Sequence, residues 1–585
     1  MKKLIPVASL LLVLATILNP VAQAADNPPR KILTGWIPYY SMKTALPDAL
    51  NNSDLIKEVM PFWYTLKFDG KAKAAVVSDL YAPANPSVPI SEPLTALRNA
   101  GYSIIPTITD GTDKLVLAGL LKSQVSRAQI ITSILNLVTV NNYDGIDLDF
   151  EGFAFVDGNT TWSATAPLWV AFVKELSIAL HAQNKVLSIS TPYVLNPNDA
   201  QKGYFVYSWA AVASSIDKLR IMTYDYSITK AGPLGPITWA ERTVQYAVSI
   251  MPASKVFVGV PGYGRDWVTA VSGVCPATIA GTVKVGAKAA TFVMRDAASL
   301  AATYGATPTF NDQFGEMTFS YQKIYNGTTD SGLSTSCTAS RTAWYQDAKS
   351  WALRAALVTK YRIGGITAWT FGMEEPLAME SIRQVAKEIA PDQVNAVTSI
   401  DKSVIDYGDA ITVAGALTIK DKSPVANVTV LIEGKSGAET SYRLLATAIT
   451  GADGTFQKPI IIGRTTAIRI HSDATWERSE GISPDTVLTV NRVLNLSAPT
   501  TAKSGNEFVV TGNVRPRAAS SYLQIESLVG GVWKPLGQPV VTDAQGSFSL
   551  TIAGQPRSIL TLRVTVAADA LWTLVTSSTF NIIIR

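Results

Sequence analysis

A short acidic segment, Tyr143-Asp144-Gly145-Ile146-Asp147-Leu148-Asp149-Phe150-Glu151, carries the strongest signal in this sequence. In a β-strand successive side chains point to opposite faces, so Asp147, Asp149 and Glu151 share one face and large apolar side chains occupy the other. Crowding and burial of three carboxyls raise at least one pKa, which suits an acid that donates a proton near neutral pH. A solvated edge strand is the alternative, but the apolar residues favour a barrel wall that opens into a functional site.

The neighbouring sequence predicts the rest of such a barrel. Between residues 31 and 390, short apolar strand candidates alternate with longer helical patterns, among them Arg127–Asn141, Ala166–Gln183 and Trp239–Met251. Eight alternations predict the α/β class and a (β/α)8 TIM barrel, whose chemistry lies at the carboxyl ends of the strands. The eight strand candidates are Lys31–Tyr40, Ile56–Leu66, Ser103–Asp110, Gly145–Glu151, Lys185–Tyr193, Leu219–Tyr226, Lys255–Tyr263 and Gly364–Phe371.

The acidic spacing Asp144-x-x-Asp147-x-Asp149-x-Glu151 resembles the DxxDxDxE signature of glycoside hydrolase family 18, the chitinase-like family. The resemblance covers roughly residues 31–390. Two runs, Met317–Tyr321 and Thr342–Ala348, look more like the branch that acts on bacterial cell walls and spore cortex than like fungal or animal chitinases. Segments similar to the family's first, sixth, seventh and eighth strands are Gly35–Tyr40, Met222–Tyr226, Val260–Arg265 and Gly364–Trp369.

This resemblance implies a retaining hydrolase that cleaves β-1,4 bonds next to N-acetylglucosamine, with the substrate's own acetamide as the nucleophile. Glu151 would be the general acid and then the base. Asp149 would hold the acetamide N–H, and Asp147 would share charge or a proton with Asp149. Asp144 would support the strand start, and the Tyr224 hydroxyl would donate to the acetamide oxygen.

Further positions would bind the sugar. Asp225 would bind sugar hydroxyls or orient Tyr224, and Trp369 would form the stacking floor under the reacting sugar. For any one aromatic residue, ordinary core packing is an equal alternative. A second group of candidates comprises Tyr39, Trp63, Tyr193, Tyr263 and Arg265.

Some positions depart from the common chitinase pattern. Phe150 stands where many chitinases have tryptophan, and Gly152-Phe153 follows the glutamate where Tyr-Pro is frequent. Neither change removes a catalytic group, but both weaken the case for crystalline chitin as the substrate. The alternatives are a non-catalytic lectin-like surface protein that binds chitin or peptidoglycan, which the complete acid set disfavours, and a structural surface protein. Chitin, peptidoglycan and N-glycan substrates stay open, as do endo and exo cleavage.

The N-terminus predicts export. Residues 1–24 have the pattern of a secretory signal peptide, with a basic start, an apolar run and the small-residue site Ala22-Gln23-Ala24. We therefore expect a secreted or cell-wall-associated protein. A membrane anchor is the alternative, but the apolar core is short, and no later stretch offers about 20 uninterrupted apolar residues. Loss of Lys2 and Lys3 lowers the formal charge from +5 to +3, too little to indicate nucleic-acid binding.

Two cysteines, Cys275 and Cys337, lie between the seventh and eighth strand candidates. Export permits a disulfide, which we expect, although two separate buried thiols remain the alternative. With His181 and His471 as the only histidines and no Cys/His cluster, we expect no metal site, no cofactor and no histidine-based triad. Residues 266–342 around the cysteines are too long for one helix and predict an inserted α+β subdomain that deepens the cleft.

Past residue 390 the pattern of the sequence changes. We expect a polar linker over 391–399 and two immunoglobulin-like β-sandwich repeats over 400–490 and 491–585, because similar segments recur at an offset of 92 to 97 residues. The repeats would be spacers or sugar- or wall-binding modules. Trp476 and Trp572 occupy matching repeat positions, which favours core packing over ligand contact. We expect a monomer.

Overall fold

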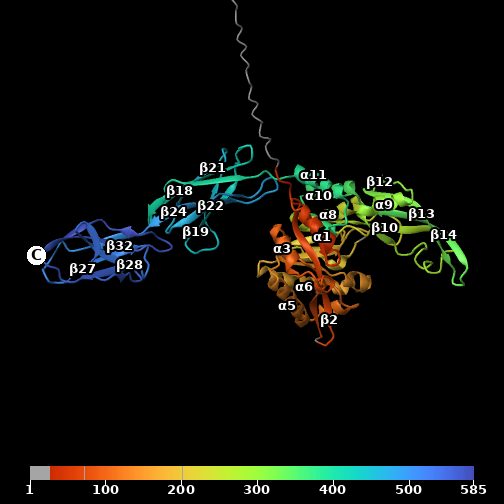
Figure 1. Ribbon diagram of the computed structural model, residues 1–585, viewed down its shortest axis with the longest axis horizontal. Helices are drawn as coiled ribbons and strands as arrows, with labels where there is room; N and C mark the ends of the chain where they lie inside the picture. Colours follow the sequence, from red (N-terminus) through yellow and green to blue (C-terminus); the bar gives the residue numbers. More distant parts are fainter. Residues whose placement is uncertain (1–26, 72, 201) are drawn as a thin grey trace, which may run out of the picture. The chain divides into compact units, whose positions relative to one another are not determined.

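The computed structural model describes residues 27–585 except 72 and 201 (Figure 1). The chain forms two compact units that divide after Ala390, and each is described by itself. The predicted signal peptide lies outside the described residues.

The first unit is built on a closed barrel of eight parallel strands. Strand β1 pairs in parallel with both β2 and β15, which closes the sheet. Strand β4 (Ser103–Ile104) also pairs with β2, and β3 (Ala74–Asp79) adds an antiparallel edge. The predicted TIM barrel is therefore confirmed. Its strands are β1 (Leu33–Pro38), β2 (Ile56–Asp69), β5 (Thr107–Asp110), β6 (Gly145–Asp149), β7 (Val186–Pro192), β8 (Lys218–Met222), β9 (Val256–Pro261) and β15 (Gly365–Trp369).

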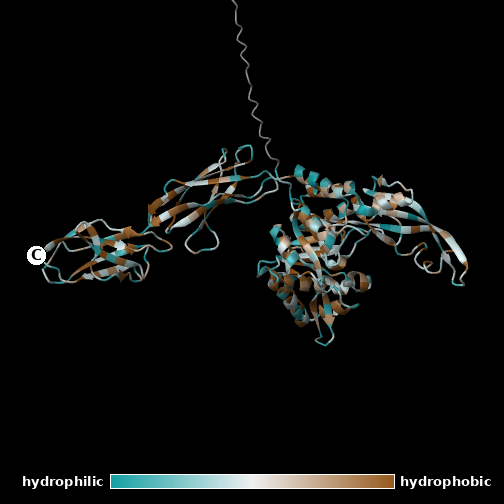
Figure 2. Ribbon diagram, in the orientation of Figure 1, coloured by the Kyte–Doolittle hydropathy of each residue, from teal (hydrophilic) through white to brown (hydrophobic). Residues whose placement is uncertain are grey.

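Helices follow the strands along the chain and lie around the outside of the barrel. They turn apolar stripes inward, and Figure 2 shows brown strands and helix faces inside this unit with teal residues on the outer surface. The helices are α1 (Met42–Asn51), α2 (Tyr81–Ala84), α3 (Ser91–Asn99), α4 (Val116–Leu120), α5 (Gln124–Val140), α6 (Trp162–His181), α7 (Trp209–Val212), α8 (Ile237–Ile250), α10 (Ala348–Tyr361) and α11 (Pro376–Glu388).

Helix α6 is unusually apolar. Residues 159–181 are long and apolar enough to span a membrane by composition alone. Trp169, Phe172 and Leu176 on this helix are fully buried, and the Trp169 indole donates to the Tyr207 carbonyl. Its apolar character is thus used in packing against the barrel.

Charged side chains fill part of the barrel interior. Arg220 on β8 is fully buried, and its guanidinium donates to Glu58 (2.5 Å) and to the Thr34 hydroxyl (3.0 Å). The Lys218 ammonium lies 2.7 Å from the other Glu58 oxygen. Although burial opposes ionisation, these two cations hold the pKa of Glu58 below its usual range. Each buried charge is paired, as such an interior requires.

The inserted subdomain lies between β9 and α10. Its sheet has the order β11-β10-β14-β13-β12 and runs from Tyr263 to Tyr345, slightly beyond the predicted 266–342. Helix α9 packs Ala297 and Ala301 against this sheet. The elements are β10 (Tyr263–Gly273), β11 (Ala290–Val293), α9 (Ala297–Thr303), β12 (Thr309–Asn311), β13 (Glu316–Thr328) and β14 (Ser334–Tyr345).

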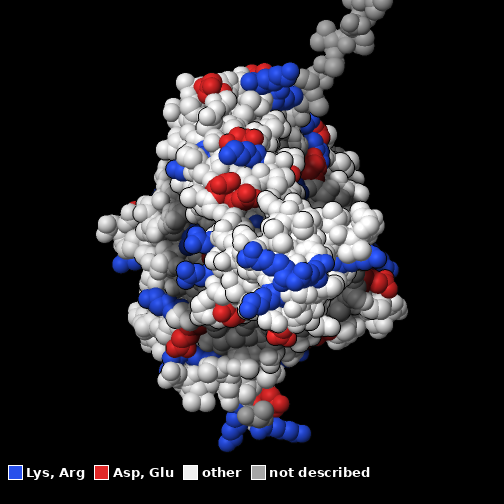
Figure 3. All heavy atoms as spheres, turned by 90° about the vertical axis from the view of Figure 1, so that its left-hand side faces the viewer, with Lys and Arg blue, Asp and Glu red and all other residues white. Residues whose placement is uncertain are grey.

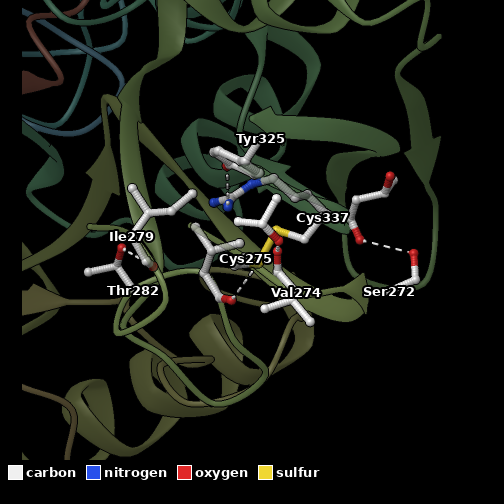
Figure 4. Close-up of a disulfide and its surroundings, with 11 residues drawn as sticks. Ser272, Val274, Cys275, Ile279, Thr282, Tyr325 and Cys337 are labelled. Atoms are coloured by element: carbon white, nitrogen blue, oxygen red, sulfur yellow. Dashed lines mark hydrogen bonds between the residues drawn. A yellow bond between two sulfur atoms is a disulfide. The ribbon is translucent and has the colours of Figure 1, made fainter. Parts of the chain in front are cut away.

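A disulfide joins Cys275 to Cys337 on β14 (Figure 4). It fastens the loop after β10 onto the long β13–β14 hairpin. The loop residues Ile279 and Val283 pack with Cys337 and Tyr325 in a small core. Cross-linking therefore stabilises the part of the subdomain that has the least apolar packing of its own.

The second unit contains two successive pairs of sheets, and each pair encloses its own apolar core. We call them the first and second sandwich. Their strands alternate brown and teal in Figure 2, as expected for sheets with one face buried. The first has sheets β16-β18-β21 and β17-β24-β22-β19-β20, and the second has β25-β27-β31 and β26-β34-β32-β28-β29.

The strands of this unit are short and follow one another directly. In the first sandwich they are β16 (Asn395–Ile400), β17 (Val404–Asp406), β18 (Ala410–Thr418), β19 (Thr429–Lys435), β20 (Arg443–Ile449), β21 (Thr455–Ile461), β22 (Thr466–Ser472), β23 (Gly481–Ile482) and β24 (Thr486–Asn491). In the second they are β25 (Val493–Ser497), β26 (Thr501–Ala502), β27 (Phe508–Arg515), β28 (Tyr522–Val529), β29 (Val532–Pro535), β30 (Val540–Val541), β31 (Ser547–Ile552), β32 (Ser558–Val566), β33 (Val575–Thr576) and β34 (Phe580–Ile584).

The predicted linker over 391–399 is wrong for most of its length. Residues 395–400 form β16, which pairs with β18, and Ala396 is buried in the first core. The segment looks polar because only alternate residues face inward. Trp572, expected to pack, does so against the core of the first sandwich, and its indole donates to the Gly463 carbonyl.

Candidate active site

A pocket of about 370 Å³ opens at the carboxyl ends of the barrel strands. Its lining combines three carboxylic acid residues, one arginine, five aromatic residues, two methionines and one threonine. These side chains are Trp36, Phe62, Asp149, Glu151, Met222, Tyr224, Asp225, Tyr263, Arg265, Thr291, Trp369 and Met373.

The acidic segment forms β6 and the turn after it. Strand β6 lies between β5 and β7, and the register pairs Asp147 with Thr107 on one side and with Ser188 on the other. All five residues of the strand are buried. Alternation then directs Asp147, Asp149 and Glu151 to the barrel interior, one above the other toward the pocket.

Asp147 is completely buried beneath the pocket. One oxygen accepts from the Ser188 hydroxyl (2.6 Å), the other accepts from Thr107 (2.9 Å), and Ser190 contacts both. The Arg220 Nε atom lies 3.8 Å away. These partners fix the orientation of the carboxylate and anchor the acidic series to the charged barrel interior.

Asp149 lines the pocket and is only 9% exposed. Its Oδ1 atom is buried and has no hydrogen-bond partner among the described residues. Burial, together with the charges of Glu151 and Asp147, raises the pKa of Asp149 well above its usual range. Burial therefore favours the protonated form of this carboxyl group, and its Oδ1 atom can accept a hydrogen bond from a ligand.

Glu151 stands at the end of β6. Burial, and secondly the charge of Asp225, raises the pKa of Glu151 to about 7. A carboxyl group with this pKa carries a proton in about half of the molecules at neutral pH, as a general acid and base must.

The turn after Glu151 is held by a carboxylate from β5. A Cβ atom at Gly152 would lie 2.2 Å from the Asp110 Oδ2 atom, so a side chain at position 152 would require the Asp110 carboxylate to move. A π-helical turn follows over Gly152–Val156, and the amides of Ala154 and Phe155 donate to the Glu151 carbonyl. The departure from Tyr-Pro noted in the sequence thus has a steric cause.

Asp225 is not a free carboxylate. Its Oδ1 atom accepts from the Tyr263 hydroxyl (2.6 Å) and from Arg265 Nε (2.8 Å). Arg265 Nη2 lies 2.7 Å from the same oxygen. The guanidinium therefore fixes the orientation of Asp225 beside Glu151.

Tyr224 contacts the Tyr263 ring edge-on, with centroids 6.2 Å apart. Burial first, and then the neighbouring acidic groups, raise the pKa of the Tyr224 phenol well above its usual range. The hydroxyl stays protonated and can donate a hydrogen bond into the pocket.

Aromatic rings form the apolar side of the pocket. Trp369 contacts Trp36 (5.5 Å between centroids) and Phe62 (5.0 Å) edge-on. The Trp36 indole donates to the Thr107 hydroxyl, which in turn donates to Asp147. Indole faces match the apolar C–H face of a pyranose ring.

The structure brings together most of the residues that the sequence nominated. Glu151, Asp149, Tyr224, Asp225, Trp369, Tyr263 and Arg265 all line the pocket, with Asp147 beneath them. Asp144 lies at the other end of β6, where a carboxylate oxygen accepts from the Ile104 amide.

Three second-group candidates lie outside the pocket lining. Trp63 was a wrong expectation, because it is fully buried and packs on Tyr81 at 4.7 Å. Tyr193 packs edge-on against Trp239 (4.8 Å). The Tyr39 ring contacts its neighbour Tyr40 (5.1 Å).

Sequence reasoning missed Trp36, Phe62, Met222, Thr291 and Met373. Trp36, Phe62 and Met222 stand at strand ends, where alternation offered a signal. Thr291 comes from the inserted subdomain and Met373 from the loop after β15, so only the tertiary structure reveals them. Across residues 27–585, apart from 72 and 201, no group of three or more His, Cys, Asp or Glu side chains is placed to hold a metal ion.

Comparisons with known proteins agree on one family. The model for glycosyl hydrolases family 18 matches residues 83–374. The putative sporulation-specific glycosylase YdhD of Bacillus subtilis (strain 168) is 24% identical over 272 residues, which are 45% of this chain and 56% of that protein. The cortical fragment-lytic enzyme of Bacillus anthracis is 25% identical over 279 residues, 47% of this chain and 57% of that protein. The chain therefore spans little more than half the length of these two relatives.

Chitinases are also among the matches. A probable endochitinase of Caenorhabditis elegans is 26% identical over 284 residues, covering 44% of this chain and 41% of that protein. The solved chitinase of Chromobacterium violaceum ATCC 12472 aligns with a TM-score of 0.47 at 22% identity, covering 61% of this chain and 98% of that one.

Proposed function

The chain carries a family 18 glycosyl hydrolase domain, and from its pocket we propose a secreted, retaining hydrolase that cleaves β-1,4 bonds next to N-acetylglucosamine. The proposed substrates are chitin-like or peptidoglycan glycans. Members of this family are glycosidases related both to spore cortex-lytic enzymes and to chitinases.

The protonation pattern of the pocket carries this proposal. Glu151, with a pKa of about 7, supplies the proton for a leaving group. An ordinary retaining glycosidase also needs a free carboxylate nucleophile. Burial raises the pKa of Asp149 well above its usual range, and one oxygen of Asp225 is held by Tyr263 and Arg265. Neither carboxyl group is arranged as a free nucleophile, which supports the family 18 mechanism, in which the acetamide of the substrate is the nucleophile.

The proposed reaction has two steps. In the first, Glu151 gives its proton to the glycosidic oxygen while the acetamide oxygen attacks the anomeric carbon, which breaks the glycosidic bond. The unoccupied Asp149 oxygen accepts from the acetamide N–H, and the Tyr224 hydroxyl donates to the acetamide oxygen. In the second, Glu151 takes a proton from water, which opens the oxazolinium ion and leaves the anomeric configuration unchanged.

The Glu151→Gln substitution tests the acid. The amide has nearly the same shape but cannot donate the proton, so we expect sugar binding to persist while turnover of a chromogenic N-acetylglucosamine oligomer falls by about two to four orders of magnitude. The matched control is Glu92→Gln on α3, an exposed glutamate outside the pocket. Activity within tenfold of the parent in the first variant would refute the assignment. A parent protein that binds oligomers without any turnover would indicate the lectin-like alternative.

The nucleophile needs a separate test. Oligomers with glucosamine in place of N-acetylglucosamine at the reacting position should resist cleavage, and a thiazoline mimic of the cyclised intermediate should inhibit. NMR of the first product should show the retained anomer. An inverted product would rule out the acetamide as nucleophile.

Substrate and location remain part of the proposal. Parallel digestion of purified peptidoglycan and of chito-oligosaccharides, with mass spectrometry of the products, distinguishes the two substrate classes and endo from exo cleavage. Export is tested by N-terminal sequencing of the protein from culture medium, where Ala25 is the expected first residue.

A further inference from the structure

The second sandwich carries a partly exposed group of three side chains. The Arg563 Nε atom lies 2.6 Å from a Glu526 carboxylate oxygen, and the guanidinium lies 4.4 Å from the centre of a Trp533 ring. Strands β28, β32 and β29 contribute one residue each. The ion pair holds the arginine against the indole, and the indole stays on the outside of the sheet.

The first sandwich repeats this group. Arg469 pairs with Glu433 (2.9 Å) and lies 3.6 Å from the Tyr442 ring centre. The glutamate and arginine face each other in the register of β19 and β22, as Glu526 and Arg563 do in β28 and β32. There, however, the ring is occupied, because its hydroxyl donates to Asp485 and the Lys435 ammonium lies 4.7 Å from its centre.

Exposed apolar side chains adjoin the group in both sandwiches, and in the first Leu444 lies opposite Glu433 and is 59% exposed. Those of the second sandwich are Leu528, Ile559 and Ile583. Leu528 is opposite Trp533 in the register and is 40% exposed. Ile559 and Ile583 face each other and are 67% and 47% exposed. By alternation all of them point away from the buried core. We call this surface the outer face, defined by Leu528, Trp533, Ile559, Thr561, Arg563 and Ile583.

The positive charges at the edges of the outer face favour a partner that carries carboxylates. Within the outer face, Arg563 is neutralised by Glu526. Exposed cations lie at its edges, because Arg557 and Arg585 flank the paired β32 and β34 and alternate with Ile559 and Ile583 onto the same face. Residues 491–585 contain eight Lys and Arg but four Asp and Glu, and Figure 3 shows blue Lys and Arg side chains gathered on the surface that faces the viewer.

We propose that the outer face binds a glycan strand of the bacterial cell wall. Sugar rings pack their C–H faces on Trp533 and the adjoining aliphatic side chains. Carboxylates of the peptide stems meet Arg557 and Arg585 at the edges. The choice of a wall glycan rests on the proposed function, since a hydrolase gains effective concentration when a second site holds the same polymer.

The experiment measures retention of the full chain on insoluble polymer. Every protein also carries Glu151→Gln, so that the polymer is not consumed, and is sedimented with purified peptidoglycan or with chitin. Ile559→Asp places an uncompensated charge on the outer face, and Trp533→Ala removes the aromatic ring. The matched control is Val509→Asp on β27, 43% exposed on the opposite sheet of the same sandwich.

We expect Ile559→Asp to raise the apparent Kd for peptidoglycan at least tenfold and Val509→Asp to change it less than twofold. Arg557→Glu combined with Arg585→Glu should weaken binding to peptidoglycan and reduce its salt dependence, with little effect on chitin. Unchanged binding by Ile559→Asp, or equal loss in the Val509→Asp control, would overturn the proposal. Thermal unfolding of each variant confirms folding.

A last comparison separates this proposal from the proposed function. In the background that retains Glu151, Ile559→Asp should hydrolyse soluble oligomers at the parental rate. Failure of the parent to hydrolyse them would refute the enzymatic proposal and leave the polymer-binding result standing on its own.

Discussion

Replacing Glu374 with glutamine should stabilise the barrel increasingly as the pH rises. Glu374 is 7% exposed and follows the loop that carries Trp369 and Met373. Its two oxygens accept from the amides of Gly372 (3.3 Å) and Met373 (3.1 Å), and Asp48 accepts from the same Gly372 amide (3.2 Å). Burial first, and then the Asp48 carboxyl, raise the pKa of Glu374 to about 9.

The sign follows from proton binding. The ordinary pKa of this carboxyl in the unfolded chain is 4.5, so between pH 4.5 and about 9 the folded state holds a proton that the unfolded state has lost. This stabilising contribution is complete below pH 4.5 and is lost as the pH rises toward 9. The slope is about 1.4 kcal/mol per pH unit, or roughly 3 kcal/mol between pH 5 and 7.5.

Glutamine stays neutral at every pH and escapes this loss. The difference in Tm between Glu374→Gln and the parent should therefore grow by about 4 °C from pH 5 to pH 7.5, using about 2.1 cal/mol/K of unfolding entropy per residue for a barrel of this size. Tryptophan fluorescence follows the barrel, because ten of the 13 tryptophans precede residue 391.

The matched control is Glu388→Gln, an exposed glutamate on α11, whose Tm difference from the parent should not change with pH. If Glu374→Gln shows the same Tm difference at both pH values, or loses stability as the pH rises, the reasoning from the buried carboxyl pair is refuted.

Three further predictions follow from the site and the domains. Tyr224→Phe removes one donor from the acetamide oxygen and should lower kcat on N-acetylglucosamine oligomers by about 10²- to 10³-fold with intact folding; a kcat within threefold of the parent would contradict that role. Cys275→Ser with Cys337→Ser opens a loop with a sequence separation of 62 residues and should cost about 4 kcal/mol in the chain-entropy model, seen as earlier proteolysis of the hairpin; identical cleavage times would contradict it. A chain ending at Ala390 should hydrolyse soluble oligomers close to the full rate, and a folded but inactive product would show that the second unit completes the site.

Much of the barrel could be predicted because its signals are local. The alternation in residues 143–151 directs the acids inward, and apolar runs mark the other strands. Trp63 shows the limit of this reasoning. The register between β2 and β5 shifts between Phe62 and Tyr64, so Phe62 lines the pocket while Trp63 packs on Tyr81. No periodicity in the sequence marks a bulge of this kind.

Sequence analysis could not identify the residues that only the tertiary structure brings to the pocket. Thr291 reaches the pocket only because β11 pairs with β10, where it faces Arg265. The raised pKa of Asp149 depends first on its burial, and the pKa of Glu151 depends on burial and on Asp225, which lies far away in the chain. Sequence analysis assigns residues 391–399 to a linker because polar residues run through them. Residues 395–400 form a strand, and the side chain buried in the core is a small alanine, Ala396.

The contact between Gly152 and Asp110 limits how this protein can be altered. Asp110 fills the space that a side chain at position 152 would need, so the two positions form one steric unit at the base of the catalytic turn. Grafting the chitinase-type Tyr-Pro after Glu151 would require either a shift of the Asp110 carboxylate or a smaller residue at 110. Homologues should therefore exchange these positions jointly, and a bulky residue at one should predict a vacated space at the other.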